Sequence, residues 1–170
     1  KHEQVRKQVE ETYAGLGTAK QSCCGPSSCG PGPGKVAELA GYEAELEAHP
    51  EAGATSFGCG NPLAFSGVAA GETVLDLGSG AGFDLLIAAE KVGDTGRVIG
   101  VDMTDAMIET ARQNLERAGV RNVEIRKGII EKLPVEDGSV DCVIRNCVIN
   151  LSPDKERSFA EMPRVLKTGG

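Results

Sequence analysis

The residues with the clearest chemical potential form a glycine-rich loop. The apolar run Thr73–Leu77 is followed by Gly78, Gly80 and Gly82. A β-branched and leucine-rich run that ends abruptly in alternating glycines predicts a buried strand, a tight loop and the start of a helix. Such a loop brings the backbone close to a nucleotide, and glycine is needed there because a side chain would block the ligand. The loop therefore predicts nucleotide binding.

Two acidic residues narrow the choice of nucleotide. The spacing Gly78-x-Gly80-x-Gly82 departs from the G-x-G-x-x-G pattern of dinucleotide sites, and Asp76 stands two places before the first glycine. A carboxylate there would repel two phosphates but would hold the cationic amino acid end of S-adenosylmethionine. A second apolar run, Arg97–Asp102, ends in another carboxylate, at the place where ribose hydroxyls are usually bound. We interpret both acids as parts of an S-adenosylmethionine pocket, the alternative being a glycine turn with solvated acids.

Alternating strand and helix patterns predict the elements that carry these side chains. Strands are expected over 73–77, 97–102, 123–126 and 139–146, and the intervening helices over 82–92 and 105–118, the latter capped by Thr104. This order predicts an α/β, Rossmann-like, doubly wound sheet. Because parallel strands end at a common edge, the ends of the strands should face one crevice.

Three more helices are expected around this sheet. One covers 2–16 with Val5, Val9 and Tyr13 on one face, and another covers 35–48. The last begins at Ser152-Pro153-Asp154, with proline in the first helical position, and docks through Phe159, Met162, Val165 and Leu166, with a kink or early end at Pro163. We divide the chain into a helical segment with a Cys/Gly/Pro-rich loop (1–60) and a nucleotide-binding domain (61–170).

Composition excludes several classes of protein. The 170 residues carry a net charge of −7, which leaves no basic face for a nucleic-acid backbone, so we expect a small-molecule partner and no nucleic acid. No apolar run is long enough to span a bilayer, and residues 1–16 are too polar for a signal peptide. We therefore expect a cytoplasmic protein with no membrane partner.

Three of the six cysteines lie in a loop rich in glycine and proline. Cys23, Cys24 and Cys29 fall within residues 22–34, which cannot sustain a helix or a central strand. A reducing cytosol argues against a disulfide scaffold, and a zinc knuckle lacks its fourth ligand. A linker with incidental cysteines is one interpretation. Vicinal thiols on a tether fit reversible redox or soft-metal chemistry better.

The other three cysteines have different settings. Cys59 stands between two glycines upstream of the first strand, and alone it would be interpreted as a small buried hydrophobe. Cys142 lies inside the fourth strand and is expected in the core. Cys147 lies at or beyond the carboxyl end of that strand, where ligands bind in such sheets. Cys147 is therefore the cysteine with the strongest functional signal.

Six segments together resemble arsenite S-adenosylmethionine methyltransferases over nearly the whole chain. They are Val5-Arg6 with Tyr13, Phe57-Gly58-Cys59-Gly60-Asn61-Pro62, the run from Leu75 to Asp84, Gly100-Val101-Asp102-Met103-Thr104, Ile130-Glu131-Lys132-Leu133, and Asn146-Cys147-Val148-Ile149-Asn150-Leu151. The glycine loop alone is shared with all class I methyltransferases. The segments around Cys59 and Cys147 are more specific to this family, and the resemblance therefore implies a functional role for Cys59.

The resemblance implies methyl transfer from S-adenosylmethionine to trivalent arsenic, a metalloid substrate held by the thiolates of Cys59 and Cys147. Trivalent arsenic is thiophilic and keeps a nucleophilic lone pair, so no general base is required. Further cysteines of the family deliver the metalloid or reduce the oxidised product by forming a disulfide, a role that falls on Cys23, Cys24 or Cys29. The reaction then depends on a thiol reductant such as thioredoxin or glutathione.

The resemblance also implies a set of cofactor contacts. Asp76 and the loop would bind the amino acid part of the cofactor, and Asp102 the ribose. Met103 would lie against the adenine, whose edge would face Ile130 and Glu131. Asn146 would lie near the methionine portion. The full set is Asp76, Gly78, Ser79, Gly80, Asp102, Met103, Ile130, Glu131 and Asn146.

Members of this family continue into further strands and a C-terminal region that bears another arsenic-binding cysteine. The chain stops at Gly170, so we interpret it as shortened after the fourth strand and its helix, and we expect weak cofactor binding and impaired methyl transfer. The fourth strand would then have an uncovered edge through which the chain could self-associate. Two other functions stay open: methylation of another small molecule, and non-catalytic thiol-based metalloid binding.

Overall fold

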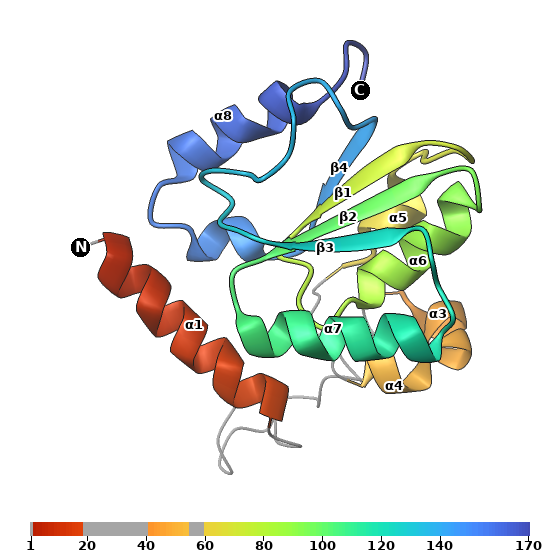
Figure 1. Ribbon diagram of the computed structural model, residues 1–170, viewed down its shortest axis with the longest axis horizontal. Coiled ribbons are helices and arrows are strands. Elements are labelled where there is room, and N and C mark those ends of the chain that lie inside the picture. Colours follow the sequence, from red (N-terminus) through yellow and green to blue (C-terminus); the bar gives the residue numbers. More distant parts are fainter. Residues whose placement is uncertain (1, 19–40, 55–59) are drawn as a thin grey trace.

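The computed structural model describes residues 2–18, 41–54 and 60–170 (Figure 1). The helices and strands follow one another along the chain as α1 (His2–Thr18), α3 (Glu43–Ala48), α4 (Pro50–Gly53), α5 (Pro62–Phe65), β1 (Thr73–Leu77), α6 (Phe83–Val92), β2 (Arg97–Asp102), α7 (Asp105–Arg117), β3 (Val123–Lys127), β4 (Cys142–Arg145), the 3-10 helix η1 (Val148–Leu151) and α8 (Lys155–Val165).

The four strands form one parallel sheet in the order β3-β2-β1-β4. β1 lies between β2 and β4, so Leu75 pairs with Ile99 on one side and with Val143 on the other. Helices α6 and α7 lie on one side of the sheet and α8 on the other (Figure 1). The predicted α/β doubly wound architecture is confirmed, with α1 added against α7.

Alternation along the strands produces two apolar cores. Val74 and Val98 face α6 and belong to the first core, while their neighbours Leu75 and Ile99 belong to the second, on the side of α8. All four side chains are at most 2% exposed. Strands buried on both faces read as continuous apolar runs, which is why 73–77 and 97–102 were recognisable from sequence.

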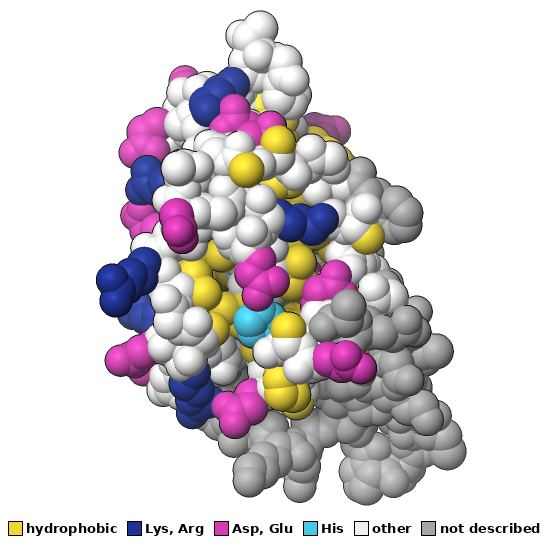
Figure 2. Space-filling model, turned by 90° about the vertical axis from the view of Figure 1, so that its right-hand side faces the viewer, with side chains coloured by type: hydrophobic (Ala, Val, Ile, Leu, Met, Phe, Trp, Pro, Cys, Tyr) yellow, Lys and Arg dark blue, Asp and Glu magenta, His cyan; other side chains and the backbone are white. Residues whose placement is uncertain are grey.

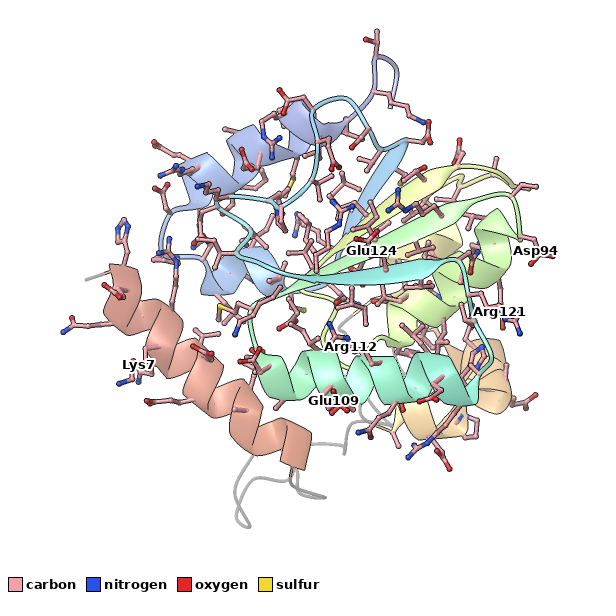
Figure 3. All side chains as sticks on the ribbon, in the orientation of Figure 1. Lys7, Asp94, Glu109, Arg112, Arg121 and Glu124 are labelled. Carbon is pink, nitrogen blue, oxygen red and sulfur yellow. The ribbon has the colours of Figure 1, made fainter. Side chains whose placement is uncertain are left out.

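The described surface is charged and mixed. On the face shown in Figure 2, acidic and basic side chains are interspersed. Lys7 and Glu109 lie on the outer sides of α1 and α7, and Asp94 is exposed just beyond α6 (Figure 3). None of the helices that the structure describes is long and apolar enough to cross a membrane.

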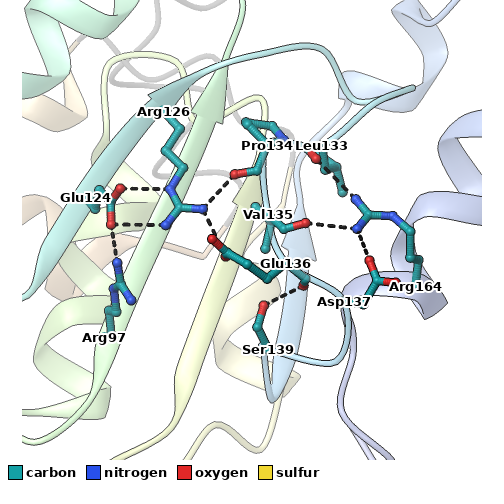
Figure 4. Close-up of polar contacts among 10 residues, drawn as sticks. All are labelled: Arg97, Glu124, Arg126, Leu133, Pro134, Val135, Glu136, Asp137, Ser139 and Arg164. Carbon is teal, nitrogen blue, oxygen red and sulfur yellow. Dashed lines mark hydrogen bonds and ion pairs between the residues drawn. The ribbon is translucent and has the colours of Figure 1, made fainter.

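A network of charged side chains fixes the segment between β3 and β4. Glu124 on β3 pairs with two arginines, Arg126 on the same strand and Arg97 on β2 (Figure 4). Arg126 also donates a 2.6 Å hydrogen bond to the carbonyl oxygen of Pro134. The two guanidinium groups lower the pKa of Glu124 to about 2. Arg164 on α8 donates to the carbonyl oxygens of Leu133 and Val135, at 3.1 and 2.9 Å. Residues 133–135 are thereby held between β3 and α8.

The last helix differs from its predicted form. It begins after Asp154, whose carboxylate accepts a 3.1 Å hydrogen bond from the amide of Arg157, so Pro153 precedes the helix instead of occupying its first position. Phe159 does not dock, because its side chain is 50% exposed. The helix continues beyond Pro163 to Val165, which is fully buried in the second core. Of the two expectations at Pro163, the early end was wrong and the kink stays a prediction.

Two smaller expectations also need correction. Thr104 precedes α7 as predicted, but its side chain makes no capping hydrogen bond; its amide donates to Asp102 instead. β4 covers only residues 142–145 of the expected 139–146. The amide of Asp141 still donates to Thr73 of β1, but the amide of Val140 donates to the carbonyl oxygen of Val165. β4 ends the sheet and pairs with β1 alone among the described strands. Just before β4, Val140 forms an isolated parallel bridge with Leu166, so the expected open edge is covered in part by the segment after α8.

Candidate functional site

A cavity opens at the carboxyl ends of β1, β2 and β4, the edge at which parallel sheets bind ligands. Its wall combines the glycine loop with segments that follow the other strands and with one face of the N-terminal helix. These parts are residues 78–81 and 83–84, residues 101–104, residues 128–131, residues 146–148 and 151–153, and Arg6, Val9 and Tyr13 of α1. The glycine loop, Asp102 with Met103, Ile130 with Glu131, and Asn146 with Cys147 thus converge on one cavity.

The glycine loop brings backbone into this wall. Gly78 and Gly80 have φ angles of 71° and 51°, in the left-handed region that side chains rarely adopt. A Cβ atom on Gly78 would lie 2.5 Å from Cγ2 of Val148, so this position has no room for a side chain. Between the glycines, the buried hydroxyl of Ser79 has no hydrogen-bond partner within the described chain. The residue is among those that line the cavity.

Asp102 anchors the loop to the end of β2. One carboxylate oxygen accepts a hydrogen bond from the amide of Gly80 at 2.9 Å, and the other accepts from the amide of Thr104 at 2.8 Å. Burial raises the pKa of Asp102, while these backbone hydrogen bonds act in the opposite direction. Asp102 lines the cavity, and its predicted contact with a ribose stays a prediction. Its structural role in shaping the loop was not foreseen.

Asp76 lies beneath the cavity wall. Its side chain is 2% exposed and is not among the described residues that line the cavity. Burial raises its pKa well above the ordinary value, and the nearby charges of Asp84 and Asp102 raise it further. Three carboxyl groups therefore share the region under the glycine loop. The predicted contact between Asp76 and the amino acid part of the cofactor remains a prediction.

Met103, Ile130 and Glu131 line the wall between β2 and the segment after β3, and their predicted contacts with an adenine stay a prediction. Glu131 is 4% exposed and accepts a 2.7 Å hydrogen bond from the hydroxyl of Ser152. The guanidinium of Arg6 lies 3.6 Å from the same carboxylate. One side of the cavity is therefore closed by an ion pair between α1 and the wall.

Cys147 follows β4 and lines the cavity, as its position in the sequence predicted. Its φ angle is 58°, the only positive value at a non-glycine position in the described part of the chain. Its sulfur atom lies 3.7 Å from Oδ1 of the neighbouring Asn146. Cys142, in contrast, is partly buried against the first core, as predicted, and burial raises the pKa of its thiol.

The other candidate thiols are Cys23, Cys24, Cys29 and Cys59. They lie outside the described residues. The predicted convergence of Cys59 with Cys147 is therefore not tested by the structure and stays a prediction.

Sequence reasoning missed the role of Tyr42 and Asp84. Tyr42 is fully buried, and its hydroxyl donates to Oδ1 of Asp84, 2.5 Å away, or to the carbonyl oxygen of Gly60, 2.6 Å away. The amide of Asn146 donates to the same carbonyl oxygen at 2.7 Å. Burial raises the pKa of Asp84, and the hydrogen bonds from Tyr42 and Asn146 oppose this effect. The available signal was an aromatic residue beside the loop-forming Gly41.

Comparison with known proteins classifies the fold and the cavity together. The family model described as a methyltransferase domain matches residues 69–170, which carry the sheet and most of the cavity wall. The chain belongs to the methyltransferase domain family. The cavity lies at the carboxyl ends of the parallel strands in this domain. The segment before residue 69 adds Arg6, Val9 and Tyr13 to that wall.

Two relatives of this methyltransferase domain are themselves arsenic methyltransferases. An arsenite methyltransferase of Halobacterium salinarum is 49% identical, over 99% of the chain and 46% of the relative. The crystal structure of CrArsM, an arsenic (III) S-adenosylmethionine methyltransferase from Chlamydomonas reinhardtii, superposes with a TM-score of 0.61 and 42% identity, over 81% of this chain and 46% of that one.

A third relative methylates a different kind of substrate. A ubiquinone/menaquinone biosynthesis C-methyltransferase of an Enterobacter species is 42% identical, over 62% of the chain and 42% of the relative. The 170-residue chain therefore spans less than half the length of each of these curated relatives.

Proposed function

We propose that the chain forms the cofactor-binding part of an enzyme that transfers a methyl group from S-adenosylmethionine to trivalent arsenic. The observation that carries this proposal is the place of Cys147, whose thiol-bearing side chain lines the same cavity as the glycine loop. A thiophilic substrate that must meet a methyl donor needs a thiol at that edge. The similarity to two arsenic methyltransferases supports the choice of substrate.

The cavity wall fits S-adenosylmethionine. Ser79 lines the cavity with a hydroxyl that has no hydrogen-bond partner among the described residues, and the backbone at Gly80 is not covered by a side chain. Asp84, Asp102 and Glu131 give the wall an acidic character that suits a cationic ligand. We assign the predicted contacts to Gly78, Ser79, Gly80, Asp102, Met103, Ile130, Glu131 and Asn146 directly, and to Asp76 through the loop that it underlies.

The bound cofactor supplies an electrophilic methyl group on a sulfonium. The task of the chain is to hold arsenic beside it: the thiolates of Cys147 and Cys59 bind the arsenic and leave its lone pair free. As that pair forms the new bond to carbon, the bond from carbon to sulfur breaks and its electrons remain on sulfur. The wall excludes water and orients the partners, and no proton transfer is required.

Methyl transfer oxidises arsenic from the trivalent to the pentavalent state, so a second turn needs two electrons. We propose that one of Cys23, Cys24 and Cys29, together with a second thiol, supplies these two electrons. The two thiols form a disulfide, which thioredoxin or glutathione then reduces. The need for reduced thiols places the reaction in the cytoplasm.

Thiol protection together with isotope labelling tests this proposal. Arsenite should slow alkylation of Cys59 and Cys147 by iodoacetamide, as quantified by peptide mass spectrometry, and should leave Cys142 unaffected. Incubation with methyl-labelled S-adenosylmethionine, arsenite and a thiol should then yield labelled methylarsenicals. Equal alkylation of both cysteines with and without arsenite would exclude a shared arsenic site.

A second candidate function is methylation of another small molecule, which the 42% identity to a C-methyltransferase favours. In that case S-adenosylmethionine binds, as calorimetry would show, while arsenite protects neither cysteine. A third outcome identifies a protein that only sequesters metalloids: arsenite would bind with the same affinity with and without the cofactor, because the two ligands would not be linked.

A further inference from the structure

The carboxylates that line the cavity differ in what balances their charge. They belong to Asp84, Asp102 and Glu131. Glu131 has a cation beside it, because the guanidinium of Arg6 lies 3.6 Å away. Asp102 accepts hydrogen bonds from two backbone amides. Asp84 has neither, and no cation pairs with it within the described part of the chain. Its charge is therefore left for a ligand to balance.

The donors that reach Asp84 are neutral side chains. Its Oδ1 lies 2.5 Å from the hydroxyl of Tyr42, and its Oδ2 lies 3.3 Å from the side-chain amide of Asn146. The single phenolic proton of Tyr42 is shared with the carbonyl oxygen of Gly60, which lies 2.6 Å away. Burial and the charge of Asp84 raise the pKa of Tyr42, so the phenol keeps this proton. These contacts orient the carboxylate without supplying a counter-charge.

Asp84 lies where the methionine end of the cofactor is expected. It occupies the first turn of α6, just after Gly82 completes the glycine loop. Asn146, which the family resemblance assigns to the methionine portion, contacts Asp84 directly. Glu131 belongs instead to the wall assigned to the adenine, after β3. Of the carboxylates in the cavity wall, Asp84 is thus the one beside the expected α-ammonium of the cofactor.

Asp76, to which the sequence assigned this ammonium, is less well placed. Its side chain is 2% exposed and is not among the described residues that line the cavity. Burial raises its pKa well above the ordinary value, which favours the neutral form. Burial also raises the pKa of Asp84, but the hydrogen bonds from Tyr42 and Asn146 favour its charged form. A ligand in the cavity therefore meets the carboxylate of Asp84 before that of Asp76.

We propose that Asp84 binds the α-ammonium of S-adenosylmethionine, while Asp76 supports the glycine loop from beneath. This inference rests on the proposed function in one respect, namely that the cavity holds this cofactor. The ammonium donates a charge-assisted hydrogen bond to Asp84 and supplies the counter-charge that the described residues do not provide. Affinity for the cofactor then depends on one carboxylate that can be changed without touching the adenine wall.

Two ligands separate this contact from the rest of the cofactor. S-adenosylhomocysteine keeps the α-ammonium, and its deaminated analogue carries hydrogen in that place. Both lack the reactive methyl group, so calorimetric titration measures binding without turnover. The ratio of their dissociation constants reports the ammonium contact, because the adenine, ribose and carboxylate groups are common to both. In the parent, the deaminated analogue should bind about tenfold to a hundredfold more weakly, the range for a hydrogen bond between charged groups.

Asp84→Asn should remove most of this difference, so that the two dissociation constants agree within about threefold. Asp84→Ser serves as a second variant, because it removes the charge without placing a new amide donor beside Asn146. In both variants the deaminated analogue itself should bind within about threefold of the parent, which shows that the cavity is intact. A purely structural role for Asp84 would weaken both ligands alike and leave their ratio unchanged.

Two comparisons complete the design. Asp94→Asn removes the same charge from an exposed position beyond the other end of α6 and should keep the ratio of the parent. Asp76→Asn should also keep this ratio, even where both affinities shift together, because Asp76 acts through the loop. A ratio that collapses in Asp76→Asn, or that persists in Asp84→Asn, overturns the inference, and so does a parent that binds both ligands equally. A parent that binds neither ligand overturns the proposed cofactor site and the inference with it.

Discussion

The guanidinium of Arg6 lies 3.6 Å from the carboxylate of Glu131, so the N-terminal helix is tied to the opposite wall of the cavity. Glu131 is buried, and its remaining described partner is the hydroxyl of Ser152. A buried carboxylate that loses its cation is destabilised more than an exposed one. The ion pair therefore adds to the packing of α1 against α7 in holding α1 over the cavity.

We expect Arg6→Gln to lower the free energy of unfolding by about 1–3 kcal/mol and to increase the amide exchange of α1. Lys7→Gln is the matched control, since Lys7 pairs with Glu11 on the exposed side of the same helix. That control should change stability by less than about 0.5 kcal/mol. Hydrogen exchange read by mass spectrometry distinguishes the two, and equal protection of α1 in Arg6→Gln and the parent would remove the ion pair from this role.

A side chain at Gly78 should be far more costly than one at Gly93. Both have positive φ, but a Cβ on Gly78 meets Val148 at 2.5 Å, whereas the space around Gly93 is open. Gly93→Ala should cost about 1–3 kcal/mol from backbone conformation alone, because its φ of 65° and ψ of −173° fall in a region that is essentially restricted to glycine. Gly78→Ala should cost more in chemical denaturation, and adding Val148→Ala should recover part of the difference. No recovery in the double variant would show that the clash is relieved elsewhere.

Asp102→Ala should loosen the glycine loop. The change removes the acceptor for two amides, those of Gly80 and Thr104, and we expect a loss of about 1–3 kcal/mol with faster exchange at both amides. Asp102→Asn keeps one oxygen and should show faster exchange mainly at one of the two. Unchanged exchange at Gly80 in Asp102→Ala would mean that the loop holds its shape without this carboxylate.

Asp76 should make stability depend on pH with a defined sign. Its pKa in the folded protein is raised above the ordinary value of 3.8, first by burial and then by Asp84 and Asp102. The folded state therefore binds the proton more tightly, and this contribution to stability is fully present below 3.8 and is lost as the pH rises through the raised pKa.

Asp76→Asn should accordingly melt at a higher temperature than the parent at pH 7.5, and the difference should shrink as the pH approaches 4. The exposed Asp94→Asn provides the control and should shift stability by less than about 0.5 kcal/mol at either pH (Figure 3). Calorimetric melting across this range gives the measurement. A constant difference between Asp76→Asn and the parent would show that the charge on Asp76 is not the cause.

The central strands were predictable because each leaves a local signal. The run Arg97–Asp102 matches β2 at both ends, since apolar residues buried on both faces stop where the chain meets the cavity. The start of α8 was less predictable: Ser152, Pro153 and Asp154 all suit a helix N-terminus, and only the bond from Arg157 to Asp154 selects one of them.

Long-range contacts left no comparable signal. The network of Tyr42 joins residues up to 104 positions apart in the sequence, and no periodicity connects them. Likewise, the polar face of α1 gave Arg6 no visible partner, because Glu131 is brought beside it only by the folded sheet. The glycine loop and Cys147 could be located from sequence, whereas the side chains that hold them in place could not.

The ion pair between α1 and the cavity wall also constrains the order of events during synthesis. The 112 residues between Thr18 and Glu131 take a ribosome roughly 6 to 22 seconds to add, at about 5–20 residues per second. Until then the guanidinium of Arg6 lacks this partner, although α7, against which α1 packs, has already been made. The ion pair that fixes α1 at the cavity can therefore form only after most of the described chain has emerged from the ribosome.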